Sequence, residues 1–115
     1  MRINKFEEIE VWKKSRRFIK KLYLSLSNCK DFSFRDQICR AAVSIMNNIA
    51  EGFEKPSDID FRRFLFISKA SAAEVRSMLY LAYDLNYISK EKLVELYKDN
   101  VEISKMLSGF IKKLS

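Results

Sequence analysis

Apolar residues recur every three or four positions along most of the chain, the spacing of one face of an α-helix. The first such segment is expected to be helical from Glu7 to Ser27. Its inward stripe is predicted at Trp12, Ser15, Ile19, Leu22, Tyr23 and Leu26. Phe18 falls outside this stripe, next to the basic side of the helix, where it could contact a neighbouring subunit.

The second segment is apolar over more than half of its helical circumference. Ser33 and Asp36 resemble a capping box at its start, and Gly52 is expected to end it after Glu51 in a left-handed conformation. Two adjacent apolar stripes are predicted, one at Phe34, Ile38, Ala42, Ile45 and Ile49, the other at Cys39, Val43, Met46 and Ala50. A helix this apolar must be covered from at least two directions. The remaining narrow polar strip holds Arg40, Ser44, Asn47, Asn48 and Glu51.

Two further helices complete the pattern. The third is expected from Asp58 to Asn86, with a cap at Ser57 and Asp60. Its middle, Ser68–Ala73, is nearly free of bulky side chains, so another helix could cross closely there, inside the bundle or between subunits. Ser89 is the expected cap of the fourth helix. Its inward stripe is predicted at Leu93, Leu96, Tyr97, Asn100, Ser104, Leu107, Phe110, Ile111 and Leu114.

The short connections predict an all-α, up-down-up-down antiparallel four-helix bundle, a single domain over residues 1–115. Two glycines and one proline agree with few, long helices. The chain has no apolar run near the 18 or so residues of a membrane span, and its charged start lacks a signal-peptide core, so a cytoplasmic location is expected. Cys29 and Cys39 without any histidine cannot supply a zinc site, so both are expected to be reduced thiols, with no metal or cofactor.

Charge is distributed unevenly along the sequence. The net charge is +7, and the first 30 residues hold nine Lys/Arg against three Asp/Glu. The basic side of the first helix is predicted to gather Lys13, Lys14, Arg17, Lys20 and Lys21, and Arg62, Arg63 and Lys69 of the third helix could widen it. Such a surface indicates either an electronegative partner or a solubilising face.

The segment from Arg40 to Gly52 carries a family resemblance. It is similar to four-helix bundle proteins encoded in intervening sequences of bacterial 23S rRNA genes, whose pattern is roughly R-A-A-x-S-I-P-x-N-I-A-E-G. Here the pattern is matched by Arg40, Ala41, Ala42, Ser44, Ile45, Asn48, Ile49, Ala50, Glu51 and Gly52, with flanking similarity at Glu10–Lys13, Phe61–Leu65 and Ala82–Ile88. Met46 replaces the usual proline, which predicts a straighter helix. Relatives include the accessory variability determinants of diversity-generating retroelements. The resemblance implies a pentameric ring and, from those retroelement relatives, binding of RNA and DNA through basic surfaces beside a reverse transcriptase.

Catalytic residues are not expected, because histidine, phosphate-binding glycine loops and nucleophile motifs are missing from the sequence. The strip Arg40, Ser44, Asn48 and Glu51 is interpreted either as a ligand or partner contact or, preferably, as a hydrogen-bonded seam that fixes helix register or a subunit contact. Apolar residues in the second and third helices exceed the needs of one small bundle, which indicates a homo-oligomer.

The leading hypothesis is a non-enzymatic oligomer that binds nucleic acid, RNA or DNA, through the basic side of the first helix. The alternative is a protein-interaction scaffold whose basic face meets an acidic protein partner. An enzyme is the least favoured reading.

Overall fold

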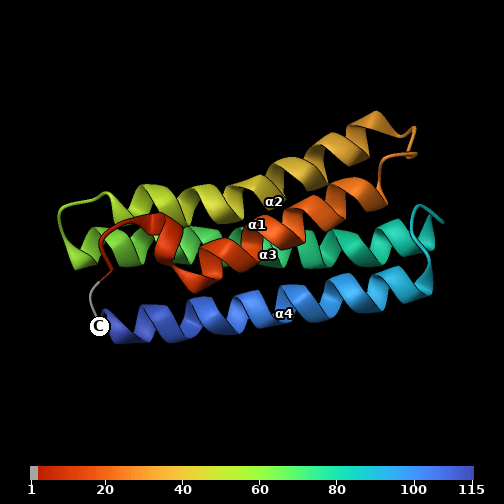
Figure 1. Ribbon diagram of the computed structural model, residues 1–115. Coiled ribbons are helices and arrows are strands. Elements are labelled where there is room, and N and C mark those ends of the chain that lie inside the picture. The colour runs from red at the N-terminus through yellow and green to blue at the C-terminus, as the bar shows by residue number, and fades with distance from the viewer. Residues whose placement is uncertain (1–2) are drawn as a thin grey trace.

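Four long helices follow one another in the computed structural model, which describes residues 3–115. A short 3-10 helix, η1 (Phe6–Glu8), precedes α1 (Glu10–Ser25), α2 (Phe32–Phe53), α3 (Asp58–Asp84) and α4 (Lys90–Lys113). The α1–α2 and α3–α4 loops lie at one end of the molecule, and the α2–α3 loop and the C-terminus lie at the other, so sequential helices are antiparallel (Figure 1). Each helix packs against two others, and α1–α3 and α2–α4 are diagonal pairs. The predicted up-down-up-down bundle is confirmed.

The inward stripe of α2 forms the centre of the core. Ile38, Ala42, Ile45 and Ile49 have 0% exposure, and Phe34 is 9% exposed, as their spacing predicts. Leucines from the other three helices meet this stripe and are equally buried, namely Leu22, Leu65, Leu79, Leu96 and Leu107. Each fully buried side chain of this size stabilises the fold by about 1.5–3 kcal/mol through the hydrophobic effect. The helix runs unbroken through Met46.

The start and rotation of the first helix differ from the prediction. Ile9 adopts an extended conformation and separates η1 from α1, because its own side chain is buried in the core at 2% exposure. Phe18 is also buried, at 1%, whereas Tyr23 is 49% exposed. The sequence predicts the reverse, with Phe18 outside the inward stripe and Tyr23 within it. The cause is that α1 packs in the cleft between α2 and α4, so its buried stripe is centred on Val11, Ser15, Phe18 and Leu22.

Asp31, and not Ser33, caps the start of α2. Its carboxylate accepts the Phe34 backbone N–H at 3.2 Å and the Tyr87 hydroxyl at 2.6 Å. The bond to Tyr87 comes from the α3–α4 connection, 56 residues away, which a local sequence pattern cannot reveal. These bonds hold the pKa of Asp31 below its usual value, first through Tyr87 and then through Phe34, and the Asp31 carboxylate raises the pKa of Tyr87 to about 12.

Gly52 lies inside α2 and does not end it. The helix continues to Phe53, and no glycine among residues 3–115 has a positive φ, so the predicted left-handed cap is wrong. The glycine is needed because α3 passes very close to it. A Cβ at position 52 would lie 2.6 Å from the Phe64 Cβ and 3.0 Å from the Phe61 Cδ1. The left-handed residue is instead Asn86, with φ 63°, after the end of α3.

Ser68 and Ser71, two of the short side chains in the middle of α3, face α2, so a close crossing lies inside the bundle. Ser68 donates a hydrogen bond to the Ile45 carbonyl at 2.7 Å, and Ala72 has 0% exposure. The caps predicted at Ser57 and Ser89 are both confirmed, because each side chain accepts the backbone N–H three residues later. On α4, Leu96, Asn100, Leu107 and Ile111 are buried as expected. Ile103 is buried too, and Tyr97 is exposed, which corrects the predicted stripe.

Candidate functional site

The five cations predicted to form one basic face on α1 point in two directions. Lys14 and Lys21 turn toward α4. The Lys14 Nζ lies 2.9 Å from the Glu102 Oε2, and the Lys21 Nζ lies 2.9 Å from the Asp99 Oδ2 and 3.2 Å from the Glu95 Oε2. The hydrogen bond that Lys21 donates to Asp99 raises the pKa of Lys21, and the hydrogen bond that Lys14 donates to Glu102 lowers the pKa of Glu102. These two lysines are therefore neutralised by acids of the same molecule, which corrects the expectation of a single free basic flank.

The other cations of α1 remain on its outer face. Lys13 lies 3.3 Å from the Glu10 carboxylate, at the surface. Arg17 and Lys20 are exposed and have no ion pair with any residue between 3 and 115. Arg16, which the sequence reasoning missed, lies beside them, with its guanidinium carbon 5.8 Å from the centre of the Trp12 ring.

These side chains make a continuous surface. Lys13, Arg16, Arg17 and Lys20, called the α1 cationic cluster below, line a shallow depression of about 370 Å³ together with Trp12. Their spacing of three, four and seven residues is the signal that could have identified Arg16 from the sequence. The cations proposed to widen the surface, Arg62, Arg63 and Lys69, belong to α3, which is diagonal to α1, so that expectation is wrong. The cluster is a local feature of the outer face of α1.

Part of the polar strip of α2 is bonded within the molecule. The Ser44 Oγ lies 2.9 Å from the Ser71 Oγ of α3, and the Asn48 amide donates to both the Ser44 carbonyl, at 2.8 Å, and the Ser44 Oγ, at 2.9 Å. The Ser44–Ser71 bond crosses the α2–α3 contact next to the one made by Ser68, and the two Asn48 bonds lie within α2 and hold the Ser44 side chain in place. This geometry suits a role of Ser44 and Asn48 in helix register.

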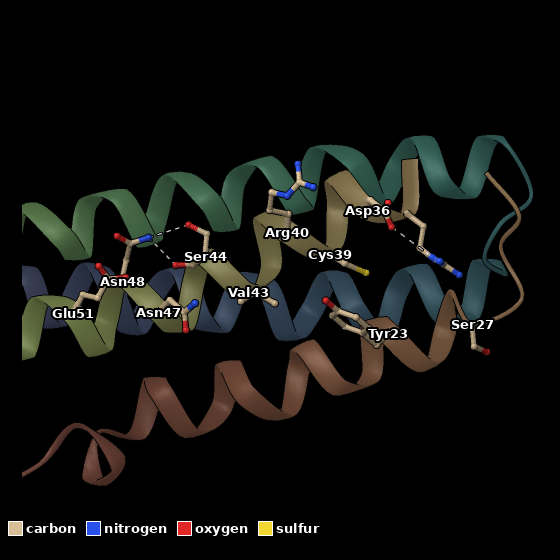
Figure 2. Close-up of a pocket in the computed structure, with 11 residues that line it drawn as sticks. Tyr23, Ser27, Asp36, Cys39, Arg40, Val43, Ser44, Asn47, Asn48 and Glu51 are labelled. Carbon is tan, nitrogen blue, oxygen red and sulfur yellow. Dashed lines mark hydrogen bonds and ion pairs between the residues drawn. The ribbon is translucent and has the colours of Figure 1, made fainter. Parts of the chain in front are cut away.

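Arg40 and Glu51, at the two ends of the strip, are exposed and open onto a groove (Figure 2). The groove has a volume of about 890 Å³. Its lining comes from α2 on one side and, on the other, from Tyr23 of α1 and Ser27 in the turn after α1, as Figure 2 shows. No carboxylate pairs with Arg40, and no cation pairs with Glu51, in the portion of the chain that the structure covers. The two side chains are available to a partner, but nothing in the groove selects a ligand chemistry.

The described residues hold no cluster of metal ligands, no exposed thiol and no helix that could span a membrane. Residues 3–115 contain no group of three or more His, Cys, Asp or Glu side chains placed to hold a metal ion. Cys29 and Cys39 are free thiols in buried positions, and burial raises the pKa of the Cys39 thiol. None of the helices between Ile3 and Ser115 has the length and unbroken apolar character that a bilayer-spanning segment requires.

Comparison with known proteins identifies a matching family and a similar solved structure. The model of the 23S rRNA-intervening sequence protein family matches residues 7–109. A crystal structure of a protein of unknown function from the S23 ribosomal protein family of Bacteroides thetaiotaomicron is 34% identical, with a TM-score of 0.83. The alignment covers 89% of this chain and 98% of that one. No functionally curated protein matches the chain.

Proposed function

This chain belongs to the 23S rRNA-intervening sequence protein family, and from that premise we propose that it is a non-enzymatic, homo-oligomeric bundle that binds nucleic acid, with RNA as the preferred form. The observation that carries the proposal is the α1 cationic cluster. Arg16, Arg17 and Lys20 are exposed, adjacent and without a carboxylate partner in residues 3–115.

Electrostatics supports a polyanionic partner for this cluster. Unpaired cations on one helix face can approach consecutive phosphates, and binding then gains free energy from released counterions. Contacts of lysine and arginine side chains with phosphates position a protein on a nucleic acid but carry no sequence information. The expected mode is therefore sequence-tolerant binding. The resemblance to retroelement accessory proteins supports a role beside an RNA-handling enzyme such as a reverse transcriptase.

The salt dependence of binding tests this function directly. A fluorescently labelled structured RNA titrated with the protein should bind at 50 mM salt and lose affinity steeply as salt rises. Three phosphate contacts per protomer predict a slope of about −2.1 to −2.7 in log K against log salt, which is about a 20- to 40-fold loss between 50 and 200 mM. If the folded protein binds neither RNA nor DNA at low salt, the proposed nucleic-acid binding is wrong.

Homo-oligomerisation is supported by the outer face of α3, which is strongly apolar for a surface. Large side chains there are about half exposed or more, namely Ile59, Phe66, Ile67 and Leu81, and the small residues Ala70 and Ala73 lie between them on the same face. Apolar patches of this kind are typical of protein interfaces. A ring of identical copies would repeat the α1 cationic cluster around the assembly and strengthen its field.

Light scattering after gel filtration measures the assembly. A mass that is a multiple of the 13.6 kDa chain is expected, five-fold for the pentamer that the family resemblance implies. A monomer at micromolar concentration contradicts this part of the proposal and leaves the nucleic-acid part to be judged by the salt titration.

One observation favours the alternative, a scaffold for an acidic protein. Within this molecule, lysines of α1 already pair with an acidic helix face, that of Glu95, Asp99 and Glu102 on α4. An acidic helix from a partner could pair with the α1 cationic cluster in the same way. Binding of poly-L-glutamate can be compared with binding of RNA to distinguish an acidic protein partner from a nucleic acid, because poly-L-glutamate carries negative charge without phosphates or bases.

A further inference from the structure

A second electropositive surface lies on the other side of α4, in the groove between α3 and α4. Two adjoining depressions, of about 420 and 510 Å³, share Tyr97, Val101 and Lys105. The polar and aromatic side chains that line them are Arg76, Tyr80, Tyr97, Lys98, Glu102, Ser104, Lys105 and Ser108. We call this surface the α3–α4 groove.

The cations of the α3–α4 groove have no carboxylate partner among residues 3–115. The Arg76 guanidinium donates to two neutral acceptors, the Asn100 Oδ1 at 3.0 Å and the Ser104 Oγ at 3.2 Å. Asn100 is fully buried and is fixed by its own bond to the Ala72 carbonyl at 3.0 Å. Arg76 is thus held in place without being neutralised, which is the reverse of the situation of Lys14 and Lys21.

The surroundings of Arg76 add to the positive potential. Lys98 and Lys105 have no ion pair with the residues that the structure describes. The one carboxylate at the edge of the groove, Glu102, is occupied by Lys14 at 2.9 Å. Lys69 and Arg62 precede Arg76 at seven-residue steps along the same side of α3, and the Arg62 Nε is buried without a hydrogen-bond partner.

Two exposed tyrosines stand at one end of this cationic surface. The Tyr80 and Tyr97 rings, one from each helix, have centroids 5.8 Å apart at an interplanar angle of 65°. They are 51% and 37% exposed, so aromatic surface faces solvent beside Lys98 and Lys105. The side-chain hydrogen bond with the Tyr97 hydroxyl raises the pKa of Tyr80 above its usual value.

We propose that the α3–α4 groove binds a single-stranded segment of nucleic acid. Phosphates lie against Arg76, Lys98 and Lys105, and bases stack on the tyrosine pair. Aromatic side chains next to a positively charged groove are the combination that binds unpaired strands, because every base offers a flat face for stacking. A duplex hides those faces in its own stack, so the groove should discriminate against it. The inference rests on the proposed function and adds a second contact surface with a defined preference.

Fluorescence anisotropy with labelled oligouridylate, compared with an RNA duplex of the same length, tests the inference in the full-length protein. The wild type should bind the single strand more tightly at equal salt. Replacing both tyrosines (Tyr80→Ala with Tyr97→Ala) should weaken single-strand binding at least about fivefold, since stacking contributes about 1–3 kcal/mol per base. Duplex binding should change by less than about twofold.

Matched controls separate stacking and charge from general effects. Tyr23→Ala removes a tyrosine of similar exposure, 49%, on the opposite side of the molecule, and should leave single-strand binding unchanged. Lys105→Glu should weaken it more than Lys30→Glu, which makes the same change of net charge in the α1–α2 connection. Thermal melts of each variant establish that the bundle is folded.

The possible failures are distinguishable. Equal affinity for single strand and duplex, or equal effects of the paired tyrosine change and Tyr23→Ala, overturns the inference and leaves the proposed function standing. Displacement of the oligonucleotide by poly-L-glutamate at equal charge concentration also overturns it and points to an acidic protein segment. Absence of any nucleic-acid binding by the wild type overturns both.

Discussion

Gly52→Val is expected to lower the free energy of unfolding by about 3 kcal/mol or more, a large fraction of the roughly 5–15 kcal/mol that stabilises a typical folded domain. The first added carbon alone would lie 2.6 Å from the Phe64 Cβ and 3.3 Å from the Phe61 carbonyl oxygen. Both contacts involve atoms close to the α3 backbone, so relief requires a shift of the helix and not a rotation of a flexible side-chain end. Urea unfolding followed by circular dichroism measures the loss.

Gly109→Val is the matched control for this substitution. Gly109 is the only other glycine and also lies within a helix, yet nothing lies within 4 Å of the position that its Cβ would take. Because valine is no worse than glycine in helix propensity, this change should leave stability within about 0.5 kcal/mol or raise it slightly. Equal destabilisation by both substitutions would show that close contact with α3 is not the reason for glycine at position 52.

Features that depend on a few neighbouring residues were predictable from the sequence. The caps at Ser57 and Ser89 require only a serine hydroxyl and a backbone N–H three residues later. The inward stripe of α2 was predictable because α1 and α3 both pack against this helix. The middle of its wide apolar face is therefore the part that lies in the core. The four-helix arrangement follows from these stripes and the short connections.

Features that depend on a distant segment were not predictable. Asp31 caps α2 in place of the expected Ser33, because the Tyr87 hydroxyl donates a second hydrogen bond to the Asp31 carboxylate. Gly52 was read as a helix end because the approach of Phe64 is invisible in the sequence. Phe18 and Tyr23 exchanged roles because the rotation of α1 is set jointly by α2 and α4.

In the candidate site, too, local features were predictable from the sequence and contacts with distant segments were not. The sequence identified a basic first helix and most of its cations. It could not show that Lys21 pairs with Asp99, 78 residues later, and therefore could not separate neutralised lysines from free ones. The α3–α4 groove was missed for a related reason: Arg76 and Lys105 belong to different helices, and the charge of neither helix stands out, since α3 has four Lys/Arg against four Asp/Glu and α4 has six lysines against four Asp/Glu.

Reversal of the α1 cationic cluster (Arg16→Glu, Arg17→Glu and Lys20→Glu together) is expected to weaken RNA binding at 50 mM salt by two orders of magnitude or more. Each lost phosphate contact removes about 0.7 from the slope of log K against log salt, so three contacts remove about 2 from the slope and between two and three log units at 50 mM. All three side chains are exposed, so the melting temperature should change little.

A second triple variant makes the result specific to this surface. Lys30→Glu, Lys55→Glu and Lys90→Glu reverse the same number of charges at exposed positions outside the helix interiors or at a helix start. Non-specific attraction to a net positive protein would make both variants equally weak. If the interface is local, the second variant should keep nearly the wild-type slope of log K against log salt. Its RNA affinity should fall only by the modest amount that a lower net charge causes. Light scattering on both variants keeps the comparison at one assembly state, because loss of the oligomer would lower the affinity of repeated surfaces without removing any phosphate contact.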